Sequence, residues 1–417
     1  MFKRRIIFIL IIFIFIIDSV GFVLADEIES EEPIEESIIT SALPEEDVPK
    51  IDSRVAVIYD RKSKRVIWGK DENKRVAMAS TTKILTATVV LENSKLEDEV
   101  TVSAKAGGIG GSRLGLKKND KITVKDLLYG LMLCSGNDAA VALAEHVGGS
   151  VEGFAEKMNN KAEELGLKDS HFVTPHGLDN PEHYTTAYEL AILADYAMQN
   201  EIFCKIVATK NINVIINGNS KNISNTNELL GYLEGVKGVK TGFTNNAGRC
   251  LVTCTNRNDF EIITVVLGAD TKKIRTQDSI KLIEYTFKNY KPVNISQIIN
   301  NKFLEWKKEN EEKIQIEKAK ENYNLDLILG NLKYTTIPIK NDDTDNIDVN
   351  IDVNYYYNAP VEANTIFGEL KVIFNNEVID TIKISNKDKI EKNNLQNYFL
   401  KILQCFAWQL VNILVWL

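Results

Sequence analysis

The sequence is poor in the residues that build metal centres and disulfide frameworks. It has five cysteines and four histidines in 417 residues, and neither set has the spacing of a zinc site. Cys250 and Cys254 could face one side of a strand, but four strand residues span about 13 Å, too far for a disulfide. We therefore predict that the cysteines are small core residues, and we expect no metal and no other cofactor.

Clustered positive charge is also scarce. There is no basic run beyond the first five residues, and the net charge is −8. Because phosphate binding requires grouped Lys and Arg, this distribution argues against nucleic acid as a partner. The hydrophobic fraction of 44% and the aromatic fraction of 8% are those of an ordinary globular protein that can bury a full core.

An apolar run follows the basic N-terminus. Three basic residues at 3–5 precede uncharged apolar residues 6–17, and small residues end at Ala25. This order is typical of a signal peptide over residues 1–25, with an uncleaved anchor or a core segment outside the membrane as the alternatives. We therefore expect an exported protein.

The chain between the two ends divides by composition. Residues 26–51 are acidic and predict a flexible spacer, because they cannot bury enough apolar surface to offset their ordering entropy. Alternating patterns predict strands and apolar repeats predict helices over 52–290. The expected strands are 54–60, 65–70, 235–243, 249–256 and 260–268, and the expected helices are 79–93, 124–133, 138–147, 151–165, 185–200 and 276–289. Strands at both ends with helices between them predict an α+β domain with a single antiparallel sheet.

The C-terminal part has a different character. Short β-type runs at 325–329, 334–339, 347–357, 367–374 and 378–384 predict a small β-rich domain over 295–390. In residues 396–417, Lys401 and three polar residues share one helical stripe, which favours an amphipathic helix on the membrane surface. A membrane span or a helix packed on the β domain are the alternatives.

Ser80 and Lys83 place a hydroxyl and an amine three residues apart at the start of a predicted helix, for which Ser80 is a suitable N-cap residue. Positions i and i+3 share a helical face, so the amine can reach the hydroxyl. A serine needs a neighbouring base to attack a carbonyl, and a lysine can serve when burial or a second cation lowers its pKa.

Two further motifs follow in the chain. Ser135 and Asn137 lie between two predicted helices, where a hydroxyl could relay a proton and an amide could hold a substrate carbonyl. Residues 220–222 repeat the Ser-x-Asn pattern in a polar loop, which we interpret as a solvated turn. Lys240-Thr-Gly242 lies in a predicted strand, where glycine allows another backbone to approach closely.

Together these motifs resemble the penicillin-binding proteins and class A β-lactamases. Their contexts resemble, more narrowly, the low-molecular-weight penicillin-binding proteins that are D-alanyl-D-alanine carboxypeptidases. The contexts that carry this resemblance are 78–86, 134–139, 175–179, 184–188, 225–230 and 238–243. It covers 52–290 strongly and implies a penicillin-binding/β-lactamase-like fold.

The resemblance also implies roles for individual residues. Ser80 would be the acyl-enzyme nucleophile and Lys83 its proton acceptor. Ser135 would relay a proton, and Asn137 would orient the substrate. The backbone N–H groups of Ser80 and Phe243 would form the oxyanion hole.

On the substrate side, the resemblance implies that Lys240, Thr241 and Gly242 bind the peptide. Arg275 would meet the substrate carboxylate. The implied substrate is a peptidoglycan stem peptide ending in D-Ala-D-Ala, and β-lactam antibiotics would acylate the same serine and inhibit the enzyme. The implied location is the outer face of the cytoplasmic membrane or the cell wall.

Several alternatives stay open. A β-lactamase would have to deacylate the drug quickly, and a D,D-endopeptidase or transpeptidase could use the same site. From another class, the chain could be a non-catalytic, penicillin-sensing peptidoglycan-binding protein. His176 could act as a base, but a buried structural histidine in a Pro-His-Gly turn is the favoured interpretation.

Overall fold

The computed structural model describes residues 48–341, 347–394, 399 and 402–409. The predicted signal peptide and most of the predicted acidic spacer lie outside these residues. The chain divides after Asn289 into two units, which are described separately.

The first unit contains the predicted strands and helices in the predicted order. It also has strands at 99–101, 121–123, 211–216 and 219–224 and helices at 104–108 and 201–207, which were not predicted. Its strands are β1 (Val55–Asp60), β2 (Arg65–Lys70), β3 (Glu99–Thr101), β4 (Lys121–Thr123), β5 (Asn211–Ile216), β6 (Asn219–Ser224), β7 (Val236–Thr244), β8 (Gly248–Arg257) and β9 (Phe260–Ala269). Its helices are the 3-10 turn η1 (Ala79–Thr82), α3 (Lys83–Asn93), α4 (Ala104–Gly108), α5 (Val124–Met132), α6 (Asn137–Gly148), α7 (Val151–Glu164), α8 (Ala187–Ala197), α9 (Glu201–Val207) and α10 (Lys272–Asn289).

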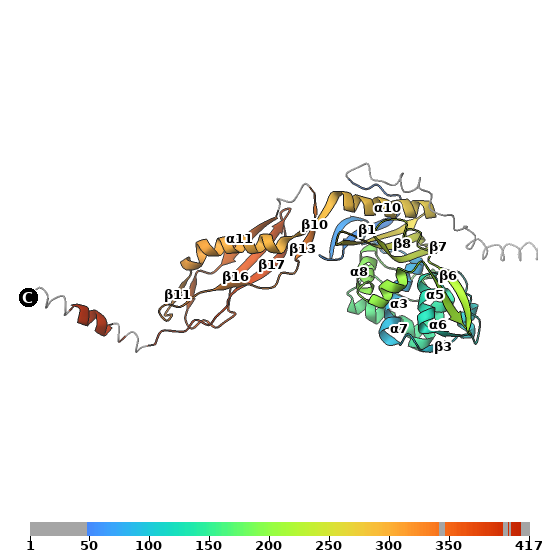
Figure 1. Cartoon of the computed structure of the whole chain (residues 1–417), viewed down its shortest axis with the longest axis horizontal. Helices are drawn as coiled ribbons and strands as arrows, with labels where there is room; N and C mark the ends of the chain where they lie inside the picture. Colours follow the sequence, from blue (N-terminus) through green and yellow to red (C-terminus); the bar gives the residue numbers. More distant parts are fainter. Residues whose placement is uncertain (1–47, 342–346, 395–398, 400–401, 410–417) are drawn as a thin grey trace, which may run out of the picture. The chain divides into compact units, whose positions relative to one another are not determined.

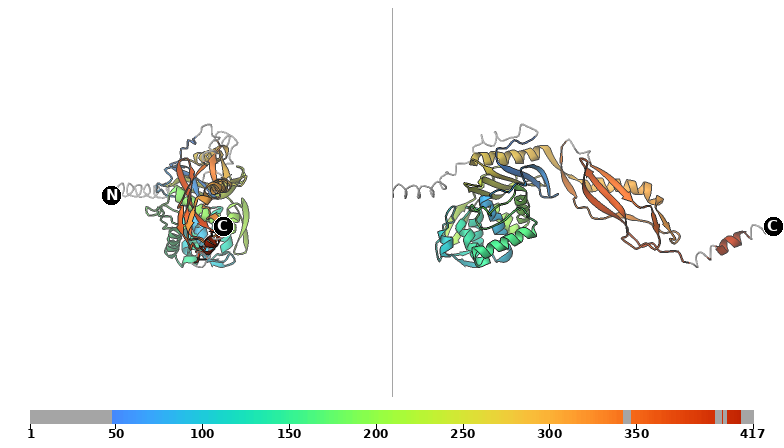
Figure 2. Two further views of the ribbon diagram at one scale, coloured as in Figure 1. Left: turned by 90° about the vertical axis from the view of Figure 1, so that its left-hand side faces the viewer. Right: turned by 180° about the vertical axis from the view of Figure 1, so that it is seen from behind.

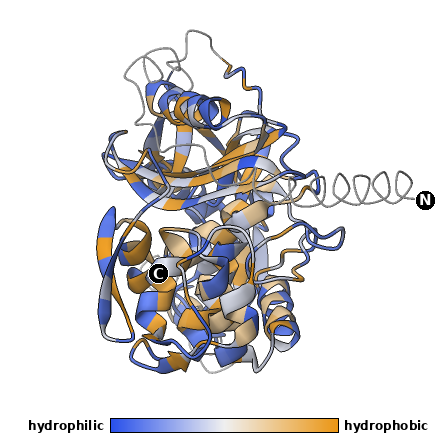
Figure 3. Cartoon of the chain, turned by 90° about the vertical axis from the view of Figure 1, so that its right-hand side faces the viewer, coloured by the Kyte–Doolittle hydropathy of each residue, from blue (hydrophilic) through white to orange (hydrophobic). Residues whose placement is uncertain are grey.

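A five-stranded antiparallel sheet organises this unit, and the predicted single sheet is joined by two separate pairs of strands, β3-β4 and β5-β6. Its strand order is β2-β1-β9-β8-β7, so the N-terminal hairpin joins the C-terminal meander as predicted. Helix α10 covers one face of the sheet, while α8 and the other helices lie on the opposite face (Figures 1 and 2). Hydrophobic residues gather in the sheet and in the helices beneath it (Figure 3). The strands β7 to β9 are nearly continuously buried, because both faces of the sheet are covered.

Helix ends in the structure carry residue types that favour them. Thr123 accepts a hydrogen bond from Asp126 N at the start of α5, and α6 ends at Gly149 with φ of 72°. The expectation that Ser80 caps its helix is wrong. Ser80 lies inside the 3-10 turn η1, and α3 begins only at Lys83. Cys250 and Cys254 are buried in the core as expected, whereas Cys405 is exposed.

The second unit is rich in β-strands, as predicted, and has its own hydrophobic core. Its strands are β10 (Tyr290–Asn294), β11 (Gln315–Glu317), β12 (Leu327–Leu329), β13 (Thr336–Lys340), β14 (Ile347–Val353), β15 (Tyr356–Asn358), β16 (Ile366–Phe374) and β17 (Glu377–Asn386). The central sheet has the order β12-β17-β16-β14. Helix α11 (Ile295–Asn310), followed by the turn η2 (Glu311–Lys313), was not predicted. It buries Ile295, Ile299 and Phe303 on one face.

Only part of the predicted membrane-attachment segment is described. Residues 402–409 are helical, and Ile402, Leu403, Phe406 and Trp408 are exposed. Among the described residues, no helix is long and apolar enough to span a bilayer.

Candidate active site

Ser80 and Lys83 meet at the start of α3. Lys83 is fully buried, and three oxygen atoms lie 2.8 Å from its Nζ, namely Ser80 Oγ, Asn137 Oδ1 and His176 O. The amide of Asn137 is oriented by its Nδ2, which donates to Gly110 O at 2.8 Å. Its Oδ1 must therefore face the lysine.

This arrangement suits a neutral amine. A neutral amine has two N–H bonds and one lone pair, and the carbonyl oxygens of Asn137 and His176 can only accept. When those two oxygens take both N–H bonds, the lone pair faces the hydroxyl of Ser80. Burial lowers the pKa of Lys83 well below its usual value, and the charge of Lys240 lowers it further. Lys83 is thus placed to take the proton of Ser80.

The turn that presents Ser80 is held in an unusual conformation. Ala79 has φ of 49°, in the left-handed region that alanine rarely adopts. Thr82 Oγ1 donates to Ala79 O at 2.8 Å, and His183 Nε2 lies 2.8 Å from Thr82 Oγ1. His183 Nδ1 accepts from Val173 N at 2.9 Å, so Nε2 carries the proton. Burial lowers the pKa of His183 to about 4, which keeps the ring neutral. No sequence signal pointed to this bracing role.

Gly177 packs closely against the turn that presents Ser80. Its φ is +84°, and a Cβ placed there would lie 1.9 Å from Ala79 O. We expect Gly177→Ala to lower the free energy of unfolding by roughly 1–3 kcal/mol and to slow acylation of Ser80, because the turn must shift. Thermal denaturation and labelling with fluorescent penicillin would measure the two effects.

Gly149→Ala is a matched control. Gly149 has φ of +72°, but a Cβ placed there would meet no heavy atom of the described residues within 4 Å. This variant should lose about 1 kcal/mol from backbone strain alone and keep normal acylation. Wild-type acylation by Gly177→Ala would show that the close contact at Ala79 does not set the geometry of the nucleophile.

The second motif lies beside the first. Asn137 N donates to Ser112 O at 2.7 Å, and Ser135, two residues earlier, has φ of 60° in the connecting turn. The buried carboxylate of Asp138 accepts from the backbone N–H groups of Leu114, Gly115 and Leu116 at 2.7–2.9 Å. Asp138 therefore fixes the loop that positions Asn137, which the sequence motif alone did not reveal.

Strand β7 carries the third motif past Ser80. A Cβ on Gly242 would lie 3.0 Å from Ser80 N, so the strand runs directly against the turn η1. Lys240 is buried, and burial lowers its pKa to about 7, with the charge of Arg275 acting in the same direction. Thr241 Oγ1 lies 2.7 Å from Thr226 Oγ1. Phe243 stacks under Arg249, whose Cζ is 3.7 Å from the ring centroid.

The burial of the Lys240 amine should lower the free energy of unfolding at neutral pH. Its pKa is about 7 in the fold against 10.5 for an unperturbed lysine, so the unfolded chain binds more protons between these values. Stability is therefore lost as the pH falls from about 10 to 7, by an order of a few kcal/mol. We expect Lys240→Met to raise the Tm at pH 7 and to lower kcat/KM, with the difference in Tm shrinking towards pH 10.

Thermal denaturation at several pH values would check this expectation. Lys237→Met is the matched control, because Lys237 is on the same strand, is half-exposed and pairs with Glu261. It should not raise the Tm. A Lys240→Met protein that is less stable than wild type at pH 7 would contradict the expectation.

Three other features singled out in the sequence are Arg275, His176, which is buried as the favoured interpretation expects, and the second Ser-x-Asn pattern. Arg275 is 4% exposed, and its Nη2 donates to the carboxylate of Glu228. His176 contacts Lys83 through its backbone carbonyl, and burial lowers the pKa of its ring to about 3, so the ring is neutral. The second Ser-x-Asn pattern, at 220–222, lies in strand β6 rather than in a turn.

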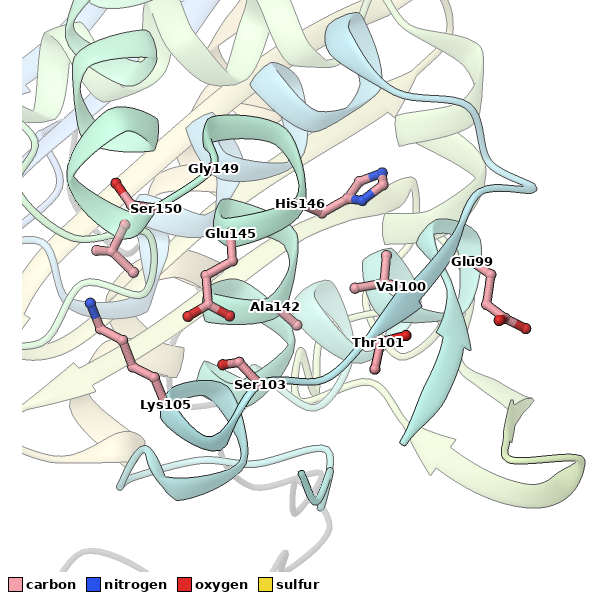
Figure 4. Close-up of a pocket in the computed structure, with 11 residues that line it drawn as sticks. Glu99, Val100, Thr101, Ser103, Lys105, Ala142, Glu145, His146, Gly149 and Ser150 are labelled. Carbon is pink, nitrogen blue, oxygen red and sulfur yellow. The ribbon is translucent and has the colours of Figure 1, made fainter. Parts of the chain in front are cut away.

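A separate cavity of about 380 Å³ lies near the C-terminal end of α6, opposite the end that carries Asn137. Glu145, His146 and Lys105 are among its lining residues (Figure 4). None of the predicted site residues lines it, so we do not assign it to the reaction.

Comparison with known proteins agrees with this geometry. Residues 42–271 match the sequence profile of the D-alanyl-D-alanine carboxypeptidases, and residues 302–392 match that of the C-terminal domain of penicillin-binding protein 5. A D-alanyl-D-alanine carboxypeptidase of Bacillus subtilis, DacF, is 31% identical over 82% of this chain and 86% of its own length. DacA of Haemophilus influenzae is 37% identical over 58% of this chain and 63% of its own length.

Solved structures give the same result. Penicillin-binding protein 5 of Haemophilus influenzae matches 83% of this chain and 99% of its own, with a TM-score of 0.67 and 27% identity. A Streptomyces DD-transpeptidase matches 58% of this chain and 98% of its own, with a TM-score of 0.56 and 34% identity. The predicted α+β fold with a following β-rich domain is therefore confirmed.

Proposed function

Since the chain belongs to the D-alanyl-D-alanine carboxypeptidase family of serine peptidases, we propose that Ser80 and Lys83 carry its reaction. The observation that supports this most strongly is the buried amine of Lys83, which lies 2.8 Å from Ser80 Oγ. The proposed substrate is a peptidoglycan stem peptide ending in D-Ala-D-Ala.

In the acylation step, Ser80 Oγ forms a bond to the carbonyl carbon of the penultimate D-alanine, and its proton passes to Lys83 Nζ. The N–H groups of Ser80 and Phe243 stabilise the oxyanion. The C–N bond then breaks, and the amine of the terminal D-alanine leaves with a proton relayed through Ser135. Asn137, through its contact with Lys83, helps to orient these groups.

In the deacylation step, water attacks the ester, and Ser80 Oγ regains its proton as the shortened peptide leaves. Lys240, Thr241 and Arg275 provide the positive and hydrogen-bonding groups for the terminal carboxylate. β-Lactams, which carry an amide and a carboxylate, would acylate the same serine.

The decisive experiment is D-alanine release from diacetyl-Lys-D-Ala-D-Ala by the purified protein, with and without penicillin pretreatment. We expect release that penicillin blocks. Stable penicillin labelling without release would favour a transpeptidase, an endopeptidase or a sensor. Rapid breakdown of the penicillin would favour a β-lactamase.

Transpeptidation is the second candidate, because the Streptomyces DD-transpeptidase is 34% identical over 58% of the chain. Adding a glycyl acceptor amine to the same assay separates the two reactions. A transpeptidase would form the new peptide at the expense of the hydrolysed product, whereas a carboxypeptidase would release the acid.

We further propose that the protein acts outside the cell, attached to the membrane surface through residues 396–417. The exposed apolar side chains of Ile402, Leu403, Phe406 and Trp408 support attachment. Sedimentation with anionic lipid vesicles, compared for the full chain and a chain ending at residue 395, tests this part of the proposal.

A further inference from the structure

Arg275 is hydrogen-bonded to a carboxylate of the protein itself, that of Glu228. Arg275 lies in the first turn of α10, and its Nη2 donates to Oε1 of Glu228. Thr276 Oγ1 donates to the same carboxylate oxygen at 2.6 Å. Burial alone would raise the pKa of the Glu228 carboxyl, but Arg275 and Thr276 hold it below its usual range, so the group is ionised.

The backbone on either side of Glu228 is firmly held. Asn227 Oδ1 accepts from Leu229 N at 3.2 Å. Leu229 is fully buried in a small core that includes Leu251 of β8 and Ile280 of α10. The carboxylate of Glu228 is therefore placed by a rigid segment rather than by a mobile loop.

Residues 225–229 also contact the Lys-Thr-Gly strand and the segment just before Ser135. Thr226 Oγ1 lies 2.7 Å from Thr241 Oγ1 of the Lys-Thr-Gly strand, and Thr226 N donates to Leu133 O, two residues before Ser135. Residues 225–229 thus connect the predicted substrate-binding strand, the turn that carries Ser135, and Arg275.

Unsatisfied polar atoms gather at this point. Buried Asn227 Nδ2, Glu228 Oε2 and Arg275 Nε find no hydrogen-bond partner among the residues that the structure describes. Folded proteins leave few such groups, so each one calls for an explanation, and a functional role is one such explanation. Two of these three atoms are donors, as recognition of a carboxylate requires.

We propose that Glu228 is a positioning residue for Arg275, fixing its guanidinium in the orientation that receives the terminal carboxylate of the substrate. Without Glu228, the guanidinium of Arg275, which is 4% exposed, would lose the acceptor that holds its Nη2 and would turn towards solvent to find another. The proposal rests on the proposed function, because it assigns a role within the same site. The competing hypothesis is that the carboxylate of Glu228 blocks the guanidinium of Arg275 and that the substrate carboxylate must displace it.

The test compares Glu228→Ala and Glu228→Gln on two peptides ending in D-Ala-D-Ala, one with a free terminal carboxylate and one amidated. We expect Glu228→Ala to raise KM for the free acid about tenfold, with kcat changed less than about threefold. Glu228→Gln should stay within about threefold of wild type, because its amide oxygen still accepts from Arg275. Neither variant should affect the amidated peptide.

Glu284→Ala is the matched control for loss of an ion pair on α10. Glu284 pairs with Arg257 at 2.6 Å, nine residues and about 14 Å of helix beyond Arg275. This variant should lose stability without any change in KM. Thermal denaturation of all variants separates misfolding from loss of recognition.

Three results would overturn the proposal. An unchanged KM in Glu228→Ala would remove the positioning role, and a lowered KM would support displacement instead. Equal losses on both peptides would indicate a general structural effect. If wild type releases no D-alanine, the proposed function fails separately, and the same variants are then compared in their acylation by benzylpenicillin and its methyl ester. The proposal is supported only if Glu228→Ala slows acylation by benzylpenicillin and leaves acylation by its methyl ester unchanged.

Discussion

Replacing Ser80 with alanine is expected to lower kcat/KM for D-alanine release by roughly 10⁴- to 10⁶-fold and to abolish covalent labelling by penicillin. The hydroxyl oxygen is the atom that forms the acyl bond, and alanine has none. The variant should fold normally, because alanine fits the 3-10 turn and the side chain of Ser80 is only partly buried.

Ser94→Ala is the matched control for this experiment. Ser94 ends α3, the helix that Lys83 begins, and its Oγ donates to Val90 O at 2.7 Å. It should keep full turnover. A non-catalytic wall-binding protein would keep its affinity for peptidoglycan in Ser80→Ala, and measurable D-alanine release by this variant would refute the mechanism.

Local sequence patterns predicted most of the fold, whereas the resemblance to a known family implied that the three motifs act in one site. Thr123 and the glycines at 149 and 166 marked helix ends, and the alternating runs marked the strands that form the sheet. These signals act within a few residues of the backbone, so a single sequence displays them. The helical repeat of apolar residues in α11 was not recognised in the sequence, because Lys, Glu and Asn dominate its exposed face.

The parts that were not predicted depend on contacts distant in sequence. Lys83 Nζ donates to the carbonyl oxygen of His176, 93 residues away, and His183 braces Thr82 across 101 residues. Ala79 adopts its left-handed φ where Gly177 packs against its carbonyl. No local pattern encodes such pairs. The motif spacing identifies which residues react, whereas the tertiary contacts determine how they are held.

Lys83 provides the second large expected effect. Lys83→Arg should lower kcat/KM by about 10²- to 10⁴-fold, although the positive charge is retained. A guanidinium with a pKa above about 12 cannot accept the proton of Ser80 at physiological pH. The mechanism therefore requires a neutral amine at this position, and a cation alone cannot substitute for it.

The dependence on pH follows from the same requirement. Burial and Lys240 lower the pKa of Lys83, so the neutral amine is already available well below the pH at which an exposed lysine loses its proton. The kcat/KM of wild type should rise with pH through this lowered pKa. In Lys240→Met the repulsion is gone, so the rising limb should move to higher pH.

Lys83→Met separates the roles of charge and proton transfer, because methionine has a similar length and no charge. If Lys83 acted only as a cation beside the oxyanion, Lys83→Arg would keep at least about a tenth of wild-type kcat/KM and Lys83→Met would not. If it acts as the base, both variants fail alike, in acylation by penicillin as well as in D-alanine release. Since Asn137 Oδ1 and His176 O lie 2.8 Å from Lys83 Nζ and can accept both N–H bonds of a neutral amine, the geometry favours the second outcome.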